Sequence, residues 1–512
     1  MNVLLLSNSA PNYQYFFGHL TKRLHADGHQ IAVAVDSNFS RSVNKLDALG
    51  FSVEVFSDHF ADHKTDFELL ARYADFNLNS ALLSDFERGE VYGIWDFVDA
   101  DYLDRLKSAL LDFFERIVIK HSIDAILYEN VSNAFAHYAF IVSQRHGVEY
   151  CGIGSSRLPG RFSITSDPLK DWGPRQHFEA ILSGNLEIDE ATRSWCDDYL
   201  RNLEATTPDY MRSNGLSDIN LLARYLRKDR FETIGTLLRH ARMDGRHAFQ
   251  IGNPVRHYFN LFKRNVARKF RARWLKTYYQ PVVQGDKYLV YPLHFHPESS
   301  TSVLAGAHLN EYEVIRNIAF NLPAGITLYV KDHLSAYGYP SKDFYRRLKK
   351  LPNVRVIAPE EPAKTLVKNS AGVITLTSTM GYEALLLGKT VFLYGSVFYE
   401  HHKNVIKVGN PANLFELIRS TIDKASPDNS YNINFIAAYY LSTKPGSLNL
   451  MLKPPASEKM ADDVYPEVVR HLKALVADGD STPSAPDRKR TQHEPHRSSA
   501  TPIPSTSGMN AG

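Results

Sequence analysis

The sequence predicts an α/β protein with two domains, each a parallel sheet wound with helices on both faces. Its 512 residues exceed what a single core of ordinary size contains. Over residues 1–155, strand-length apolar runs alternate with helix-length amphipathic stretches, and the same alternation resumes near residue 285. This alternation is typical of parallel sheets covered by helices.

The first half begins with the apolar strand Val3–Leu6, a helix over 13–27 and the strand QIAVAVD, which is a Rossmann-like start. A further strand, AILYE, ends at Glu129. The second half repeats the pattern with KYLVYPL, ITLYVKD, VRVIAP, GVITLTS and TVFLYG as strands. We therefore expect two doubly wound sheets.

Between the halves the sequence becomes mostly helical and polar, and the C-terminus is rich in Ser, Thr and Pro. A segment of that terminal composition cannot bury enough apolar surface to fold. The predicted parts are an N-terminal Rossmann-like domain (1–160), a helical basic insertion or connector (161–284), a C-terminal Rossmann-like domain (285–477) and a disordered tail (478–512).

Composition indicates a soluble, cytoplasmic protein. Hydrophobic residues make up 44% and charged residues 22% of the chain, as in ordinary globular proteins. The chain contains Cys151 and Cys196 without metal-ligand spacing nearby, which favours a reducing compartment. No cationic residue precedes the first apolar run, and no run reaches the ~18 apolar residues of a membrane span.

Positive charge is concentrated in residues 221–276, which contain fifteen Lys or Arg and three acidic residues. Aromatic side chains such as Tyr258, Phe259 and Trp274 are interleaved with these cations. The segment suits an anionic membrane surface, although a solvated helical face explains most charge runs. A net charge of +3 is too small to indicate nucleic acid, so we expect no nucleic-acid partner.

The most informative segment is GVITLTSTMGYEALLLGKTVFLYG, which predicts a strand, a hydroxyl-rich turn, a short helix and a second strand. Ser378 and Thr379 would lie at the helix N-terminus, where free amides and the helix dipole favour phosphate. Gly381 would let a ligand approach the backbone, and Glu383 would accept both ribose hydroxyls. The alternative is an ordinary helix cap with a solvated glutamate.

Polar residues also follow two other strands of the second half. HFHPESST places His294, Glu298, Ser299 and Ser300 after the first of these strands, where hydroxyls and amides would contact phosphate or sugar. The alternative is a capped helix start with Pro297 in its first turn.

Lys331 and His333 stand at the end of ITLYVKD, where their side chains would offset phosphate charge. An ordinary solvated loop is the alternative.

A metal site is a weaker hypothesis for the same region. His294, His296 and Glu298 offer zinc-type ligands, but no further ligand follows at telling spacing, and His401 and His402 are distant in sequence. We expect neither a metal nor another cofactor.

In the N-terminal domain a transfer reaction needs a base near the acceptor. Glu129 is the first candidate, beside Asn130 as an acceptor-binding residue, and Asp36 and His19 are weaker candidates for the base. A carboxylate at a strand end also commonly caps the next helix.

Arg157 and Arg161, in SSRLPGRF, would neutralise an anionic acceptor or a donor carboxylate. Surface arginines are common, so the alternative is that both residues are ordinary surface side chains.

Three of these motifs together resemble the bacterial capsule polysaccharide biosynthesis family, which includes Kdo transferases. They are YPLHFHPESST (Tyr291–Thr301), YVKDH (Tyr329–His333) and TSTMGYEALLLGKTVFLYG (Thr377–Gly395). The resemblance implies a GT-B-like glycosyltransferase with two Rossmann-like domains facing across a cleft, donor on the C-terminal domain and acceptor on the N-terminal one. One departure is Leu334, which follows His333 where family members often carry proline.

The expected function is therefore hexosyl or Kdo-type transfer from a nucleotide-sugar donor to a polysaccharide or lipid-linked glycan acceptor. In this scheme His333 would act with Glu129 in catalysis, with the protein peripheral on the inner face of the cytoplasmic membrane. Alternatives are a nucleotide-sugar epimerase of the same architecture and a non-catalytic partner in capsule assembly or export.

Overall fold

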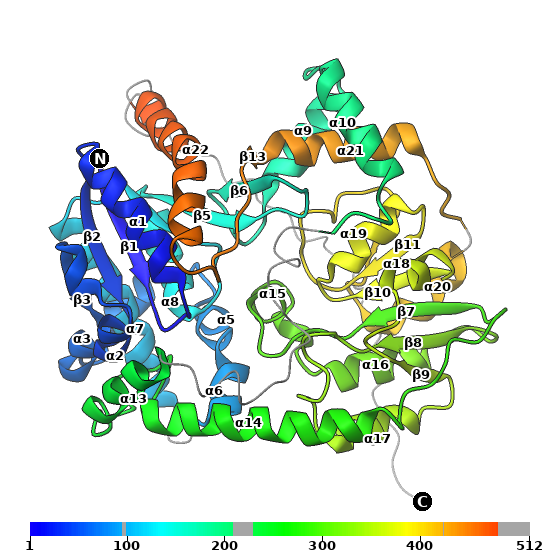
Figure 1. The fold of residues 1–512 in the computed structure, drawn as a ribbon, viewed down its shortest axis with the longest axis horizontal. Coiled ribbons are helices and arrows are strands. Elements are labelled where there is room, and N and C mark those ends of the chain that lie inside the picture. The colour runs from blue at the N-terminus through cyan, green and yellow to red at the C-terminus, as the bar shows by residue number, and fades with distance from the viewer. Residues whose placement is uncertain (95–98, 208–228, 423, 480–512) are drawn as a thin grey trace, which may run out of the picture. The chain divides into compact units, whose positions relative to one another are not determined.

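The computed structural model describes residues 1–94, 99–207, 229–422 and 424–479. Residues Met1–Val469 form one compact unit that contains two sheets (Figure 1), and the described residues that follow, 470–479, belong to a second unit. Most of the predicted disordered tail and residues 221–228 of the basic segment lie outside the described residues.

The first sheet has the strand order β13-β6-β5-β4-β1-β2-β3. Its strands are β1 (Asn2–Ser7), β2 (Gln30–Val35), β3 (Ser52–Val55), β4 (Ala125–Glu129), β5 (Glu149–Ser155), β6 (Arg161–Thr165) and β13 (Lys444–Pro445). Strands β1 to β5 pair in parallel. Their order, with β1 and β4 adjacent at the centre, is that of a Rossmann-like sheet.

Two antiparallel strands extend this sheet at one edge, β6 against β5 and β13 against β6. Residues 161–165 and 444–445 thus pair with the first sheet, which differs from the predicted helical insertion from 161 and the predicted continuous domain 285–477. Phe162 and Ile164, buried at alternate positions, explain why RFSIT forms a strand.

The second sheet is entirely parallel and has the order β12-β11-β10-β7-β8-β9. Its strands are β7 (Tyr288–Pro292), β8 (Thr327–Lys331), β9 (Val354–Ile357), β10 (Gly372–Thr375), β11 (Thr390–Leu393) and β12 (Val405–Lys407). Counted from β7, this is the order 3-2-1-4-5-6 of dinucleotide-binding sheets. The predicted pair of Rossmann-like sheets is confirmed.

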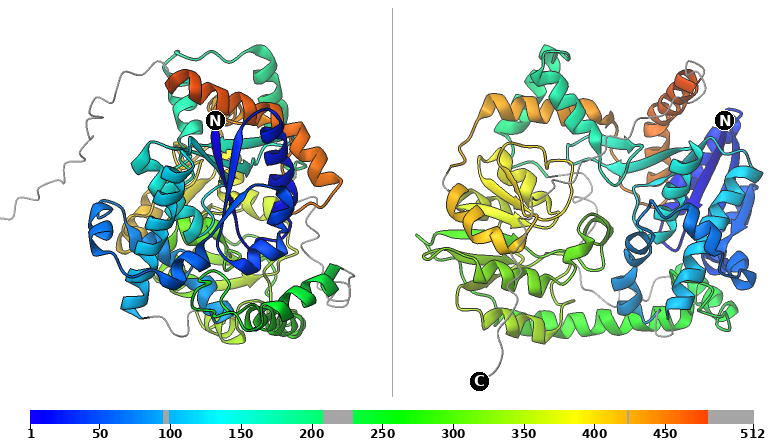
Figure 2. Two further views of the ribbon diagram at one scale, coloured as in Figure 1. Left: turned by 90° about the vertical axis from the view of Figure 1, so that its left-hand side faces the viewer. Right: turned by 180° about the vertical axis from the view of Figure 1, so that it is seen from behind.

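Helices cover both faces of the second sheet (Figures 1 and 2). Leu289 and Tyr291 of β7 pack in one hydrophobic cluster, and Tyr288 and Val290 pack in another. Successive side chains of a strand point to opposite faces, so a strand buried on both faces is apolar throughout.

The helices that accompany the first sheet include the long α7. They are α1 (Tyr13–Ala26), α2 (Asn38–Val43), α3 (Phe56–Asp62), α4 (Phe67–Arg72), α5 (Leu78–Leu83), α6 (Phe86–Tyr92), α7 (Ala100–Lys120) and α8 (Ala134–His146), with the 3₁₀ turn η1 (Leu46–Leu49).

The remaining helices follow β6 in the chain. They are α9 (Trp172–Leu182), α10 (Glu190–Arg201), α13 (Asp229–Arg239), α14 (Pro254–Leu275), α15 (Ser299–Leu304), α16 (Glu311–Phe320), α17 (Lys342–Lys349), α18 (Ala363–Lys368), α19 (Thr379–Leu386), α20 (Leu414–Thr421), α21 (Asn429–Ser442) and α22 (Ala456–Gly479), with the turns η2 (Gly306–His308) and η3 (Pro411–Asn413).

Short polar side chains start many of these helices. Asn133 accepts the Ala136 amide before α8, and Ser378 accepts the Met380 amide before α19. Such caps satisfy amides that have no partner inside the helix. The helices therefore begin immediately after the polar turns that follow the strands.

Candidate functional site

The candidate site lies at the carboxyl ends of β7 and β10, the two central strands of the second sheet. The order of the sheet reverses between these strands, and ligands of open α/β sheets bind at such a switch point. His294 follows β7, and its Nε2 accepts the amide of Thr377, which follows β10, at 3.3 Å. The predicted motifs at His294 and Thr377 are therefore brought together.

The imidazole of His294 is fixed by contacts on both ring nitrogens. Because Nε2 accepts the Thr377 amide, Nδ1 carries the proton and donates to Oε1 of Glu311 at 2.8 Å. Glu311 Oε1 also accepts the His294 amide at 3.1 Å and the Tyr291 hydroxyl at 3.0 Å. This buried carboxylate therefore holds the end of β7.

His296 forms a cationic bridge between Glu311 and Glu87. Its Nε2 lies 3.2 Å from Glu311 Oε2, and its Nδ1 lies 2.7 Å from Glu87 Oε1 on α6. Burial opposes the charge on His296, but hydrogen bonds to both carboxylates raise its pKa to about 10. Burial would raise the pKa of Glu311, but hydrogen bonds from His294 and His296 lower it to about 2.

At the N-terminus of α19, Ser378 is held from several directions. Its amide donates to Thr375 Oγ1 at 3.1 Å, and its carbonyl accepts the Tyr399 hydroxyl at 2.6 Å. Within the part of the chain that the structure describes, the Thr379 amide and hydroxyl have no protein partner. These donors at a helix N-terminus suit a phosphate oxygen.

Gly381 differs from its predicted role. A Cβ at this position would lie 2.5 Å from the Tyr399 hydroxyl oxygen. The glycine thus makes room for Tyr399, which holds Ser378, rather than for a ligand.

Glu383 and Glu298 share an electrostatic neighbour in Arg157. Burial raises the pKa of Glu383, and the charges of Lys364 and Arg157 oppose this shift. Burial among surrounding protein atoms also raises the pKa of Glu298, opposed by charges that include Arg157. Arg157, from the loop after β5, is therefore close to both predicted donor-binding carboxyls.

Glu383 and Glu298 each have a polar neighbour in the protein. Lys364 Nζ lies 3.8 Å from Glu383 Oε1, a loose ion pair. Ser299 and Ser300 begin α15, and the Ser300 hydroxyl hydrogen-bonds Glu298. The Glu298 side chain itself is exposed to solvent.

Lys331 differs from its predicted contact with phosphate. Its side chain is buried, and Nζ donates to the Pro359 carbonyl at 2.9 Å. Burial lowers the pKa of Lys331, although nearby carboxylates such as Asp332 oppose this shift. The ammonium thus joins the end of β8 to the chain after β9.

The His333 ring offers one N–H as a hydrogen-bond donor. Its Nδ1 accepts the Ser335 amide at 3.1 Å, so the proton of the neutral ring lies on Nε2. Burial lowers its pKa to about 4, and the charge of Lys331 adds to this shift. His333 is therefore a neutral hydrogen-bond donor near pH 7.

The alternative metal ligands have other partners. His294 and His296 contact carboxylates and an amide, as described above. His402 is buried, with Nε2 3.1 Å from Asn432 Oδ1, and Nδ1 accepts the Asn404 amide at 3.1 Å. The nitrogens of His402 thus serve the local packing around α21.

A cavity of about 560 Å³ adjoins His294 and His296. Its lining includes Glu87, Arg264, Glu311 and Tyr339. This volume is within the range of about 300–1,000 Å³ that small-molecule sites occupy. The bridge from His296 to Glu87 and Glu311 thus forms part of its wall.

In the first sheet, Glu129 ends β4 beside the switch point between β1 and β4. Burial raises the pKa of Glu129, while hydrogen bonds with Ser132 and Tyr13 oppose the shift. A raised pKa suits a general base or acid.

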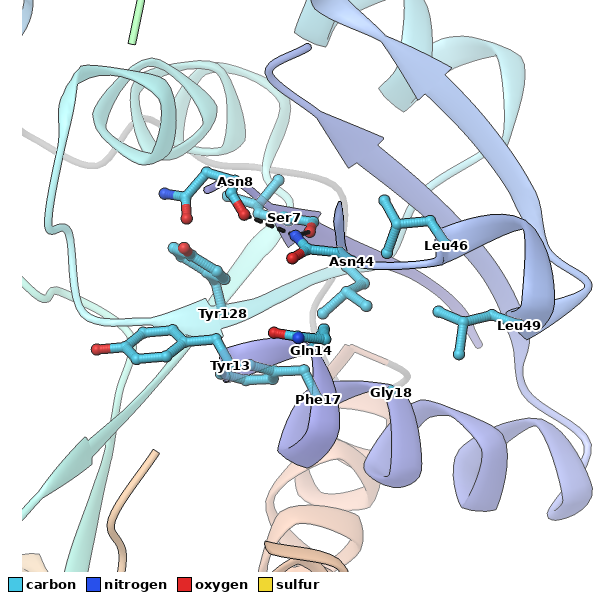
Figure 3. A pocket seen from close by; sticks show the side chains of 12 residues that line it. Ser7, Asn8, Tyr13, Gln14, Phe17, Gly18, Asn44, Leu46, Leu49 and Tyr128 are labelled. Carbon is cyan, nitrogen blue, oxygen red and sulfur yellow. Dashed lines mark hydrogen bonds between the residues drawn. The ribbon is translucent and has the colours of Figure 1, made fainter. Parts of the chain in front are cut away.

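A separate cavity of about 10 Å³ lies behind the end of β1, lined by residues that include Asn8, Gln14 and Tyr128 (Figure 3). It has room for about one water molecule. The Tyr13 hydroxyl points away from it (Figure 3). This cavity is too small for a sugar.

Other predicted residues of the first half serve the fold. The Arg161 guanidinium donates to Thr443 Oγ1 at 2.7 Å and to the Tyr440 carbonyl at 2.9 Å, so it differs from its predicted acceptor contact. His19, a weaker candidate for the base, is paired with a carboxylate: its Nε2 lies 2.9 Å from Asp462 Oδ1.

Asn130 and Asp36 also have local partners. Asn130 Oδ1 accepts the Thr165 hydroxyl at 3.1 Å, which places its amide over β5 and β6. Asp36 is buried and accepts the Ser37 hydroxyl at 3.2 Å. Burial raises the pKa of Asp36 to about 6.

Two contributors, Glu311 and Glu87, were missed at the sequence level. Glu311 begins α16, and glutamate is common at helix starts because it interacts favourably with the helix dipole. Glu87 lies on α6, far from the histidines in sequence. Glu311 follows the two histidines by fifteen and seventeen residues, and no helix or strand spacing relates them, so the sequence carries no signal for these contacts.

The His296 bridge predicts a pH-dependent stability. The folded-state pKa of about 10 lies above the ordinary 6.5, so the contribution is full below pH 6.5 and is lost as pH rises through 10. We expect His296→Gln to lower the melting temperature most near pH 6.5 and progressively less toward pH 10. Thermal melts of both proteins across this range measure the difference.

His308→Gln is the control, because burial lowers the pKa of His308 and its pH dependence has the opposite sign. A His296→Gln effect that is constant between neutral and alkaline pH would contradict the assignment.

Similar solved structures share low sequence identity with the chain. The Thermosulfurimonas dismutans KpsC β-Kdo 2,4-transferase is 15% identical over 64% of this chain and 85% of its own, with a TM-score of 0.33. The 2,7-transferase from the same organism is 14% identical over 70% and 89%, with a TM-score of 0.31. UDP-GlcNAc 2-epimerase from Neisseria meningitidis is 12% identical over 86% and 98%, with a TM-score of 0.29.

All three TM-scores lie below 0.5. No curated protein matches the chain in sequence. The model of the capsule polysaccharide biosynthesis protein family matches residues 227–402. This stretch contains all three motifs on which the predicted resemblance rests, so the resemblance is confirmed over residues 227–402.

Proposed function

We propose that the protein is a glycosyltransferase of capsule polysaccharide biosynthesis that uses a nucleotide-sugar donor. The observation that carries the proposal is the convergence of His294, the open N-terminus of α19 and Glu383 at the switch point of the second sheet. The family match covers this convergence. The donor would therefore bind to the second sheet.

The donor phosphates would contact the Thr379 amide and hydroxyl at the positive end of α19. His333 Nε2–H would add a neutral donor. Glu383, one turn further along α19, would accept the ribose hydroxyls. Arg157 and Glu298 would lie toward the sugar, because Arg157 interacts with both Glu298 and Glu383.

On the acceptor side, Glu129 would accept the proton of the attacking hydroxyl, since its raised pKa makes it a better base than an exposed glutamate. The leaving nucleotide would be stabilised by the α19 dipole and hydrogen bonds, without a metal. The acceptor would be a polysaccharide or a lipid-linked glycan.

Donor binding is tested with UDP, GDP, CMP and dTDP by thermal shift and calorimetry. We expect one nucleotide to stabilise the protein, and Glu383→Ala to weaken its binding by about tenfold to a hundredfold, because hydrogen bonds to a charged group contribute about 1.5–3 kcal/mol. Glu416→Ala, which alters an exposed glutamate of α20, is the matched control. Failure of every nucleotide to bind would refute the transferase proposal.

The epimerase alternative is separated by the products formed. A transferase needs an acceptor, whereas an epimerase converts the bound nucleotide sugar in its absence. Appearance of an epimerised nucleotide sugar without acceptor would replace the proposed reaction by that alternative.

Removal of the proposed base should affect turnover more than donor binding. We expect Glu129→Gln to lower kcat by about 10²–10⁴-fold, the usual contribution of general base catalysis, with donor affinity unchanged. Glu149→Gln is the matched control, because burial also raises the pKa of Glu149. This residue lies at the amino end of β5, whereas Glu129 lies at the carboxyl end of β4. Equal losses in both variants would remove Glu129 from this role.

Peripheral membrane attachment is proposed for α14. Val255, Phe259, Phe262 and Phe270 are exposed by 42%, 59%, 45% and 65%. Their spacing places them along one side of the helix, while Asn265 and Arg268 are buried on the other. Lys263 lies beside Phe259 at 5.6 Å from its ring centroid. Apolar side chains flanked by cations suit the interface of an anionic bilayer.

Among the described helices, none has the length and apolarity needed to span a bilayer. Attachment through α14 is tested by co-sedimentation with vesicles. We expect binding to phosphatidylglycerol vesicles, weakened by salt, and at least tenfold weaker binding by Phe259→Ser/Phe270→Ser. Phe320→Ser, which removes an exposed aromatic from α16, is the control. Equal binding by both variants would contradict the assignment to α14.

A further inference from the structure

Three metal-binding side chains meet between α3 and α7, apart from the candidate transferase site. His59 is on α3, His63 follows that helix, and Asp112 is on α7. One ligand atom from each lies within 4.8 Å of the others. The side chains are 18%, 9% and 20% exposed, so the cluster is largely shielded from solvent.

Two of the separations lie near those expected around a tetrahedral ion. His59 Nε2 lies 3.1 Å and His63 Nδ1 lies 3.7 Å from Asp112 Oδ2. Zinc bonds to nitrogen and oxygen are about 2.0–2.2 Å long, which places two ligand atoms of a tetrahedron about 3.3–3.6 Å apart. Two imidazoles and a carboxylate are common zinc ligands, and a water would supply the fourth position.

The tautomer of His63 directs a lone pair toward the carboxylate. Ser108 Oγ donates to the Arg105 carbonyl at 3.2 Å, so it accepts the proton of His63 Nε2 at 2.8 Å. Nδ1 of the neutral ring then has no proton to offer Asp112. Two acceptors that face each other in this way repel unless a cation lies between them. A hydrogen bond to the other ring nitrogen is also the usual support of a metal-bound histidine.

His59 directs its Nε2 to the same carboxylate oxygen as His63. Its buried Nε2 lies 3.1 Å from Asp112 Oδ2, so one ion could contact both atoms.

Two arginines near the cluster leave room for a cation. Arg105 donates to the His63 and Phe60 carbonyls, so its guanidinium is directed to the backbone. Arg116 Nε lies 2.8 Å from Asp112 Oδ2, but its side chain is 69% exposed and can turn toward solvent. An ion would take the position on Oδ2 that Arg116 now approaches.

We propose that His59 Nε2, His63 Nδ1 and Asp112 Oδ2 bind a zinc ion that ties the end of α3 to α7. The site would stabilise this part of the first half rather than take part in sugar transfer. Because α3 directly follows β3, the ion would fasten the edge of the first sheet to its longest covering helix.

The test uses the full chain without an affinity tag, freed of metal by a chelator. We expect one Zn²⁺ per chain by calorimetry, a higher melting temperature with Zn²⁺, and a Co²⁺ spectrum with the visible bands of tetrahedral coordination. His59→Gln and Asp112→Asn should each abolish the Co²⁺ bands. Ser108→Ala, which removes the hydroxyl that supports His63 and also accepts the Asp66 amide, should weaken Zn²⁺ binding about tenfold to a hundredfold.

Asp104→Asn and His121→Gln, both at α7, are matched controls and should bind Zn²⁺ as the unaltered protein does. Melting curves without metal establish that each variant is folded. Absence of Zn²⁺ binding by the unaltered chain, or binding that persists in folded His59→Gln and Asp112→Asn, would overturn the proposal.

Discussion

The second sheet depends on one buried carboxylate at its switch point. Glu311 accepts the ring proton and amide of His294, and His294 in turn accepts the amide that follows β10. These contacts join the ends of two strands that neighbour each other in the sheet but are separated by about eighty residues in the chain. Burying a carboxylate without such donors would cost several kcal/mol, so the burial of Glu311 depends on these contacts.

This constraint also positions the start of α19. The Thr377 amide is used by His294, and the next amide is used by Thr375, so the first helix donor left for a ligand belongs to Thr379. Tyr399 holds the Ser378 carbonyl from the other side and fills the space beside Gly381. A rigid turn with one exposed donor group is better suited to orient a phosphate than a flexible loop is.

The sequence predicted strand ends well and side-chain directions poorly. Apolar runs bounded by polar turns located β7, β8 and β10, because strands buried on both faces leave a strong hydrophobic signal. Lys331 and Arg161 were assigned to ligands, yet each finds a backbone carbonyl that only tertiary folding brings near. Glu311 was missed for the same reason, since its partners precede it by fifteen and seventeen residues and no helical or strand spacing relates them.

The two switch points differ in how they treat a carboxylate, and this difference supports a division of roles. Histidine partners keep Glu311 ionised, with a pKa of about 2, so it cannot exchange protons near pH 7 and acts as a fixed anion. Burial instead raises the pKa of Glu129, whose partners are hydroxyls. Environments that push two carboxyl pKa values apart commonly separate a proton-transferring group from a positioning one. On this basis Glu311 would shape the donor side while Glu129 would handle the acceptor proton.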